Sequence, residues 1–334
     1  MSIGGSEKEY IFSLFLLQNP KYLEEIIGGK LSRIEAEVPV GRKKVDLLAV
    51  ESSRRLPVYI ETQLNQSDPL HLKTIHDILE SIREGIVIWI ARSFRREHLM
   101  QIFAYLKRNK QKYVEFFALE IHPKVIVEVE CLNQMYKLDI WNELKRISEN
   151  KYPRLKRIES YSQIPLTHTG REIGSINYDW TRDEDVKQYM LECLREKVPQ
   201  FLNVWKSKKH NRFDKVLTLG AGRDGVYLKL SAKDRQGFAS VHLYFNQIQV
   251  GLYNQLKQRL PELKQDIHPH MSASDRKIGV RFTPDSDLDV TVAKLAAILE
   301  QMLSYFGSHI YGGNDVGDKD RKGDHYYRQH TILA

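Results

Sequence analysis

Residues 43–64 read KKVDLLAVESSRRLPVYIETQL, two runs rich in β-branched residues that flank a short polar turn. Such runs predict two strands joined as a hairpin. If the turn closes symmetrically, Val50 opposes Pro57 and Asp46 opposes Glu61. Two carboxylates opposite each other on a sheet repel, and burying an unpaired charge among apolar neighbours is costly. This stretch therefore predicts that a cation offsets the two acids.

A divalent metal ion is one cation that fits two acids on adjacent strands. Mg²⁺ characteristically takes one or two carboxylates and completes its shell with waters and substrate phosphate. Asp46 and Glu61 are therefore candidate magnesium ligands. Two alternatives stay open at this point. The acids could pair with local bases such as Arg42 or Lys44, or a β-bulge could move them apart.

Outward from the hairpin, hydrophobic periodicity predicts an α/β domain over residues 1–150. Residues 67–85 predict a helix that begins at Ser67 and ends at Gly85. IVIWIA (86–91) is continuously apolar, which is typical of a strand covered on both faces. The remaining elements expected are helices at 6–20 and 95–110 and strands at 34–40 and 114–121. The order α-β-β-β-α-β-α-β indicates a mixed sheet with helices packed against it.

The rest of the chain predicts a second domain. Residues 151–180 show no sustained period and contain two prolines, so we expect a linker. Residues 181–310 predict an α+β domain, and residues 311–334 are polar and glycine-rich, which is typical of a flexible tail. The elements expected in the second domain are helices at 183–206, 247–265 and 288–306 and strands at 215–219, 226–232, 240–245 and 277–282.

Composition excludes several classes of protein. The 334 residues exceed one domain of roughly 100–200, and 42% hydrophobic content excludes global disorder. No apolar run approaches the ~20 residues of a membrane span, and no signal peptide is recognisable, so we expect a cytoplasmic protein. Two cysteines, Cys131 and Cys193, cannot form a disulfide framework or a cysteine zinc site. The formal net charge of +8 permits a polyanionic partner.

The segments V-D-L-L-A and V-Y-I-E-T-Q resemble the core motif of the PD-(D/E)XK (restriction-endonuclease-like) nuclease superfamily. In that motif an Asp lies on one strand and a (D/E)-x-K follows on the next. The α-β-β-β-α-β order is similar to that superfamily's core as well. Three longer segments resemble a group of bacterial two-domain proteins, which join a nuclease-like N-terminal domain to a C-terminal domain of unknown function. These segments are GRKKVDLLA (41–49), IETQLNQSDPLHL (60–72) and IVIWIARSFRREHL (86–99).

The resemblance covers residues 6–150 well and 180–310 more loosely, and it implies metal-dependent phosphodiester hydrolysis. Asp46 and Glu61 would hold Mg²⁺ or Mn²⁺, which would lower the pKa of a bound water and stabilise charge on the scissile phosphate. The third motif position, usually Lys, would orient or activate that water. This chain has Gln63 there, and an amide can hold a water but cannot act as a base.

Two further site residues follow from the resemblance. Lys73, on the helix after the hairpin, could replace the missing lysine, although an exposed helical lysine is commoner. Many relatives place a metal-binding Glu on the first helix, which makes Glu9 a third candidate ligand. Ser6 and Glu9 also form an S-x-x-E capping box, which explains Glu9 as a structural residue.

A basic segment follows the apolar strand at 86–91. Residues 83–112 contain eight Lys or Arg and two Glu. Arg92, Arg95 and Arg96 come directly after the strand, where they could contact phosphates. The alternative is a solvated basic surface with no ligand.

The sequence as a whole predicts a bacterial, metal-dependent nuclease acting on DNA, with a role in defence, mobile-element biology or repair. The alternative is a catalytically inactive nuclease-fold module that binds DNA or a protein. Nothing in the sequence separates DNA from RNA as the substrate. We expect the C-terminal domain to recognise a substrate or partner, or to form a homodimer.

Overall fold

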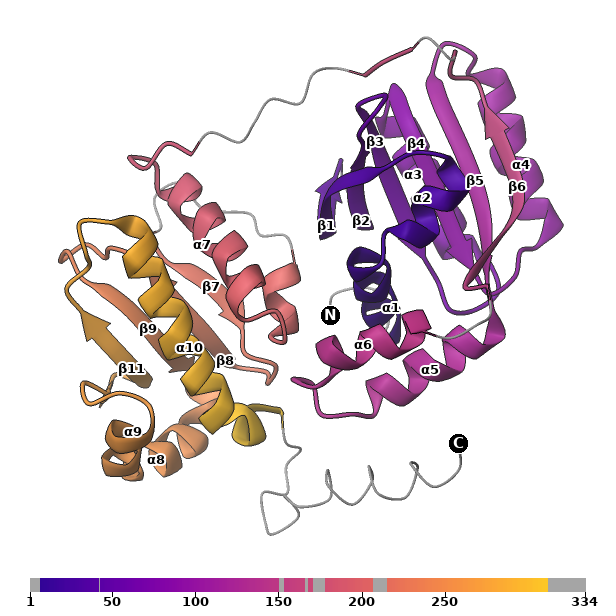
Figure 1. Ribbon diagram of the computed structural model, residues 1–334. Helices are drawn as coiled ribbons and strands as arrows, with labels where there is room; N and C mark the ends of the chain where they lie inside the picture. The colour runs from indigo at the N-terminus through magenta and orange to yellow at the C-terminus, as the bar shows by residue number, and fades with distance from the viewer. Residues whose placement is uncertain are drawn as a thin grey trace. The chain divides into compact units, whose positions relative to one another are not determined.

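The computed structural model of the protein describes residues 7–41, 43–149, 153–165, 168–170, 178–206 and 215–311. Contacts divide the chain into two units. The first comprises residues 1–135, 139–175 and 205–208, and the second comprises 136–138, 176–204 and 209–334. Figure 1 shows a sheet with associated helices in each unit. None of the helices described is long and apolar enough to cross a membrane.

The first unit is built around a six-stranded mixed sheet in the order β1-β2-β3-β4-β5-β6. Strands β3, β4 and β5 run parallel, and the other neighbours are antiparallel. Its strands are β1 (Leu31–Val40), β2 (Lys43–Glu51), β3 (Leu56–Thr62), β4 (Glu84–Ala91), β5 (Tyr113–Ile121) and β6 (Leu155–Ser162). Its helices are α1 (Glu7–Gln18), α2 (Lys21–Ile27), α3 (Pro69–Ser81), α4 (Arg96–Arg108), α5 (Pro123–Asn133) and α6 (Ile140–Glu149).

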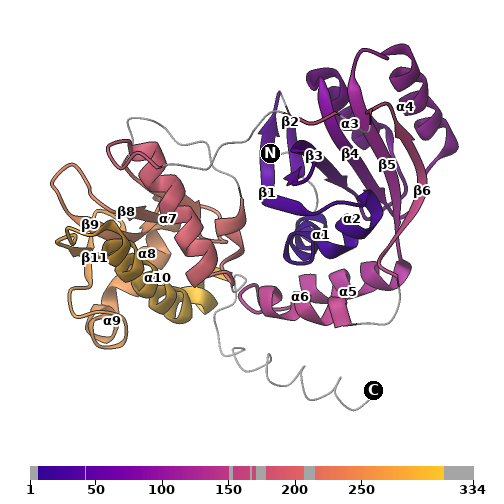
Figure 2. The same ribbon diagram turned by 45° about the horizontal axis from the view of Figure 1, so that its top comes forward.

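Helices cover both faces of this sheet, which confirms the mixed α/β class. On one face α3 and α4 bury apolar residues such as Ile75 and Ile102 against Val87 and Phe116 of the sheet. Each fully buried side chain of this size contributes roughly 1.5–3 kcal/mol. On the other face α1 contacts β1, β2 and β3, and α5 and α6 pack against α1 (Figure 2). Both layers hold β3 between them.

The hairpin register agrees with the symmetric turn. Five pairs join β2 to β3, from Glu51 opposite Leu56 to Leu47 opposite Ile60, and they include Val50 opposite Pro57. This register is favoured because it keeps the apolar side chains of β2 and β3 on the faces of the sheet that the helices cover. Val45, Leu47 and Ala49 of β2 are all fully buried.

Several boundaries in the first unit differ from the predicted ones. The helix expected at 67–85 spans only Pro69–Ser81, and its cap is Asp68, whose side chain accepts the N–H groups of Leu70 and His71. Ser67 is occupied elsewhere, since its hydroxyl accepts the backbone N–H of Arg95. Gly85 does not end the helix but lies within β4 at a positive φ of 140°.

Part of the segment expected as a linker belongs to the first unit. Residues 155–162 form β6, which pairs with β5 at the edge of the sheet. The period-two pattern is missing because a register shift interrupts the pairing at Ala118 and Leu119, and because charged residues on an edge strand can face solvent. Residues 151–152, 166–167 and 171–177 of the expected linker lie outside the described residues.

The second unit is an α+β fold around a five-stranded antiparallel sheet in the order β10-β11-β9-β8-β7. Its strands are β7 (Leu217–Gly220), β8 (Val226–Ser231), β9 (Ala239–Phe245), β10 (Ser272–Ser274) and β11 (Lys277–Phe282). Its α-helices are α7 (Asp183–Lys197), α8 (Val250–Gln258), α9 (Leu260–Asp266) and α10 (Leu288–Tyr311), and short 3₁₀ turns lie at Leu202–Trp205 and Gln247–Gln249. In both views α10 lies against the sheet with α7 beside it (Figures 1 and 2).

The second unit is α+β as predicted, but its helix boundaries differ: α10 extends to Tyr311, beyond the predicted end at 306, and the other two predicted helices are shorter or divided. The helix predicted at 183–206 ends at Lys197, and the helix predicted at 247–265 is split into α8 and α9. Pro261 explains the break, because proline lacks the backbone N–H that would continue α8 and fits the first turn of a new helix. The predicted flexible tail lies outside the described residues from 312 onward.

Candidate functional site

Strands β2 and β3 part at Asp46. The ladder ends at Leu47 and Ile60, so the predicted pairing of Asp46 with Glu61 is not a ladder pair. Instead, Asp46 Oδ2 accepts both the backbone N–H and the hydroxyl of Thr62, each at 2.7 Å. The backbone N–H of Asp46 in turn donates to the carboxylate of Glu61. Asp46 and Glu61 therefore lie just beyond the end of the β2–β3 ladder, where hydrogen bonds to their side chains connect the two strands.

Both acids are hard to ionise in this position. Burial, together with the charges of Glu9 and Glu37, raises the pKa of Asp46 to about 6 despite the two hydrogen bonds from Thr62. Burial also raises the pKa of Glu61 well above its ordinary value, and the charge of Asp46 adds to this rise. The Glu61 side chain is almost enclosed, at 7% exposure. Burial is the largest cause of both shifts, because removal from water disfavours the charged form of a carboxyl group.

Of the two local bases named as alternatives, the structure describes only Lys44, and it does not pair with Asp46 or Glu61. Lys44 pairs with Glu37 at 3.3 Å, and Arg42 lies outside the described residues. Among the residues that the structure describes, no basic group forms an ion pair with Asp46 or Glu61. Glu61 Oε2 is buried and has no hydrogen-bond partner among them. An orphaned carboxylate oxygen is rare in a folded interior and calls for a ligand or a proton.

The sequence did not single out Lys43, whose positive charge lowers the pKa of Glu61. Its ammonium group lies at the limit of an ion pair with Asp77, at 4.0 Å. A lysine that precedes the motif Asp by three residues is the signal that could have indicated it. Its position on β2 makes it the basic residue in electrostatic reach of the acids.

Glu9 of α1 approaches the same site from the opposite layer. Its Oε1 accepts the backbone N–H of Leu64, just after β3, at 3.3 Å, and its side chain is 8% exposed. Its charge raises the pKa of both Asp46 and Glu61. Ser6, the partner in the predicted capping box, lies outside the described residues. Within the described chain no group of three or more His, Cys, Asp or Glu residues has a metal-binding arrangement.

Gln63 holds the loop between β3 and α3. Its Nε2 donates to the carbonyl of Gln66 at 2.8 Å and to the carboxylate of Asp68 at 3.0 Å, and its Oε1 accepts the indole N–H of Trp89 at 3.2 Å. The side chain is fully buried. Because both amide hydrogens are taken, the geometry gives Gln63 a positioning role.

Lys73 is exposed on α3, whereas its neighbours Leu72 and Ile75 are buried. Nothing in the described contacts brings its ammonium group to Asp46 or Glu61. Its proposed replacement of the motif lysine therefore stays a prediction.

A second ionisable pair lies at the start of α3, and sequence reasoning did not find it. Asp68 Oδ2 lies 2.9 Å from His71 Nδ1, and the same oxygen accepts the amide of Gln63. Partial burial opposes ionisation of Asp68, but its hydrogen bonds from the backbone and ring of His71 and from the backbone of Leu70 lower its pKa overall. An acid three residues before a histidine at a helix start is the signal that could have indicated this pair.

The three arginines lie at the edge where β3 and β4 end. Arg92, Arg95 and Arg96 are all exposed. Because β3 and β4 are parallel, the loops that follow them lie together, and the Arg92 N–H donates to Asn65 while Ser67 donates its backbone N–H to Ser93. The sheet thus brings the basic loop to the edge that carries Glu61, as the basic-segment hypothesis requires.

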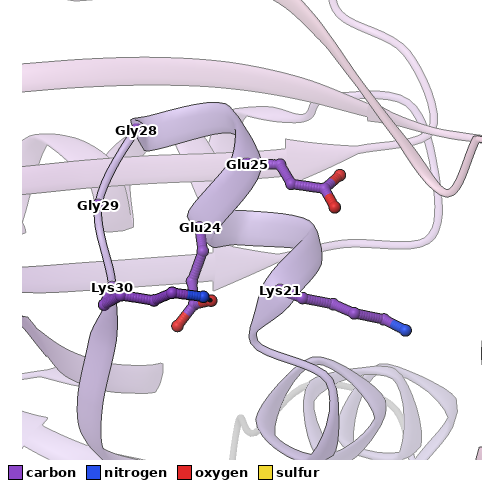
Figure 3. A pocket seen from close by; sticks show the side chains of 6 residues that line it. All are labelled: Lys21, Glu24, Glu25, Gly28, Gly29 and Lys30. Atoms are coloured by element: carbon purple, nitrogen blue, oxygen red, sulfur yellow. Dashed lines mark hydrogen bonds and ion pairs between the residues drawn. The ribbon is translucent and has the colours of Figure 1, made fainter.

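A separate surface hollow lies between α2 and β1 (Figure 3). It is lined by Lys21, Glu24, Glu25, Gly28, Gly29 and Lys30. Lys30 pairs with Glu24 at 2.8 Å, and Lys21 and Glu25 do not point toward them. The hollow contains none of the predicted site residues, and its acids and bases balance, so we assign it no role.

Comparison with known proteins adds little to this geometry. No protein-family model matches the chain, and no curated protein matches it. One solved structure that it resembles is the crystal structure of a repair endonuclease from Pyrococcus abyssi, at 22% identity and a TM-score of 0.26. The match covers 36% of this chain and 49% of that chain, so this chain aligns with about half of that protein. Similarity this limited carries no functional conclusion, and function has to be inferred from the side chains themselves.

Proposed function

We propose that the first unit is a metal-dependent nuclease that hydrolyses phosphodiester bonds of DNA. The observation that carries the proposal is the uncompensated acid pair, in which Glu61 Oε2 is buried without a partner beside Asp46. Two carboxylates with oxygen free to coordinate suit a hard divalent cation such as Mg²⁺ or Mn²⁺. The donor chemistry therefore fits the metal that the motif implies.

Each residue has a stated task in this proposal. Asp46 and Glu61 hold the ion, and Thr62 fixes the Asp46 carboxylate through its two hydrogen bonds. The ion, when bound, would acidify a water and stabilise charge on the scissile phosphate. Glu9, at the same site, is the further candidate ligand. Lys43, rather than Gln63, supplies positive charge near the acids.

Proton transfer falls to His71 in this account. The Asp68 carboxylate orients its Nδ1, so Nε2 is the ring nitrogen that would serve as an acid or base. Gln63 links β3 to Asp68 and so ties the histidine to the strand that carries Glu61. The exposed arginines after β4 would bind the phosphate backbone without reading sequence.

Cleavage assays with isosteric variants test the proposal. Plasmid and single-stranded DNA are incubated with Mg²⁺ or Mn²⁺ and wild type, Asp46→Asn, Glu61→Gln, or the control Glu25→Gln. Glu25 is an exposed acid on α2, outside the proposed site. We expect metal-dependent cleavage that falls more than about 100-fold in the two site variants, since metal catalysis contributes several kcal/mol and 1.4 kcal/mol is tenfold. The control should cleave like wild type.

The alternative is a nuclease fold that has lost activity and only binds. It predicts DNA binding without cleavage in either metal, unchanged by Asp46→Asn and Glu61→Gln. That outcome would contradict the enzymatic proposal. We favour the enzyme because a buried Glu61 beside a half-buried Asp46 would repel the phosphate backbone, which does not favour binding alone.

A further inference from the structure

The sheet of the second unit has two unlike faces. One face is apolar and buried: Leu228, Leu243 and Ile278 lie side by side on β8, β9 and β11. The next residues in register point to the other face, and there Tyr227 lies beside Tyr244, which lies beside Lys277. Tyr227 and Tyr244 are half-buried, and Lys277 is exposed. The second face is therefore aromatic and basic.

Positive charge is spread over this second face. The strand register places Lys229, Lys277 and Arg281 on the second face. No strand residue between these three basic residues is Asp or Glu. Asp234, outside the strands, pairs with Arg281 at 2.7 Å and is the acid that forms an ion pair with these three among the described residues. Burial lowers the pKa of His242 at the centre of the face to about 4, and the charges of Lys277 and Arg281 lower it too. The face thus repels cations.

Aromatic rings and cations alternate closely here. The ring centroids of Tyr227 and Tyr244 are 6.5 Å apart at an interplanar angle of 40°. Lys229 Nζ lies 4.0 Å from the centroid of the Tyr244 ring, and the Arg276 guanidinium lies 6.0 Å from it. Arg281 lies 4.3 Å from the ring centroid of Phe238, which is itself exposed. Rings held by cations on a flat sheet offer π-faces and phosphate partners together.

We propose that this face binds single-stranded DNA. Unpaired bases would stack on Tyr227 and Tyr244, and Lys229, Lys277 and Arg276 would contact the phosphates. Charge complementarity favours a polyanion over a basic partner, since the strand residues of this face include no Asp or Glu. A single strand is favoured over duplex because stacking on the tyrosines requires bases whose π-faces are uncovered.

Fluorescence anisotropy with the full-length chain tests this site. The probe is a fluorescein-labelled 15-nucleotide single strand of mixed sequence, and EDTA keeps the proposed cleavage site inactive. We expect Tyr227→Ala and Tyr244→Ala each to raise Kd about 5- to 150-fold, as loss of one base–aromatic stack does. Tyr244→Phe, which keeps the ring, should bind within twofold of wild type. Lys294→Gln on α10 removes an exposed lysine elsewhere in this unit and should change nothing.

Lys277→Gln gives a second readout that a folding defect would not mimic. Lys277 is exposed, so the variant should keep the wild-type melting temperature. Its plot of log affinity against log salt should lose about 0.7 in slope, as expected for one phosphate contact on a single strand. No binding by wild type, equal losses in Lys294→Gln, or duplex or RNA of the same sequence bound as tightly would overturn the proposal. Because the assay excludes metal, its outcome is independent of whether the first unit cleaves DNA.

Discussion

The two sheets of this chain place their polar groups in opposite ways. In the first unit, Asp46 and Glu61 are drawn inward where β2 and β3 part, and burial raises the pKa of both. In the second unit, Tyr244 and Lys229 are partly exposed on the second face of the sheet, and the Lys229 ammonium lies over the Tyr244 ring. The enclosed acids can be satisfied only by something small, such as a proton or a metal ion. The basic residues on the second face of that sheet lie on two different strands, β8 and β11, so a ligand that contacts all of them must be extended.

The largest expected effect separates the two sites. Glu61→Gln should reduce metal-dependent cleavage more than about 100-fold, while binding of a single strand in EDTA stays within twofold of wild type. Tyr227→Ala should raise the Kd for a single strand in EDTA about 5- to 150-fold and leave metal binding intact. Initial cleavage rates and anisotropy measure the two quantities on the same preparations. If either variant changed both quantities equally, the two regions would not be separate sites.

The close approach of β11 to β9 in the second unit can be tested at Gly279. A Cβ there would collide with the Val241 carbonyl and the His242 backbone, so Gly279→Ala should lower the free energy of unfolding by about 3 kcal/mol. Gly251 on α8 is the matched control, because a Cβ there meets nothing within 4 Å. Gly251→Ala should stabilise by about 0.4–1 kcal/mol. Denaturant melts give both values, and equal effects would contradict this packing.

The enclosed acids should make metal-free stability depend on pH. The pKa of Asp46 rises from an ordinary 3.8 to about 6 on folding, so its favourable contribution is complete below about pH 4 and is lost as the pH rises through 6. Relative to Asp46→Asn, wild type should lose on the order of 2 kcal/mol of unfolding free energy between pH 4 and 7. Urea melts in EDTA at several pH values measure this difference. Parallel curves for the two proteins would refute the buried, uncompensated state of Asp46.

A smaller effect is expected at Gln63. Gln63→Ala would leave the buried indole N–H of Trp89 without its acceptor and remove the hydrogen bond to Asp68. We expect this to lower the free energy of unfolding by about 1–2 kcal/mol. Gln111→Ala, at an exposed glutamine, is the control and should be close to neutral. Thermal melts followed by tryptophan fluorescence report both changes. A neutral Gln63→Ala would argue against its role in holding the loop.

The sequence indicated the parts of the fold that local pattern controls. The hairpin register followed from β-branched runs around a short turn, and the approach of Asp46 and Glu61 followed from that register. It did not indicate β6, whose apolar residues do not alternate, or the short helices α2, α5 and α6. The roles of Gln63 and Asp68 depend on how a loop folds back onto a neighbouring strand. No spacing along the chain encodes that contact.

The second unit shows the complementary limit. Its strands other than β10 were predicted from their apolar residues, since Leu228 and Leu243 mark the buried face, whereas the three residues of β10 are too few to show a pattern. Tyr227, Tyr244 and Lys277 come together only when three strands align in register. Their pairing joins segments that are far apart in the chain, and single-sequence periodicity contains no information about it.

Metal binding tests the central claim most directly. Calorimetric titration of Mn²⁺ into metal-free wild type, Glu61→Gln and Glu25→Gln at pH 7.5 measures whether the acid pair holds an ion. We predict a binding isotherm for wild type and Glu25→Gln, loss of at least tenfold in affinity for Glu61→Gln, and a matching rise in melting temperature only where the ion binds. Equal affinity in all three proteins, or no binding to wild type, would contradict the account.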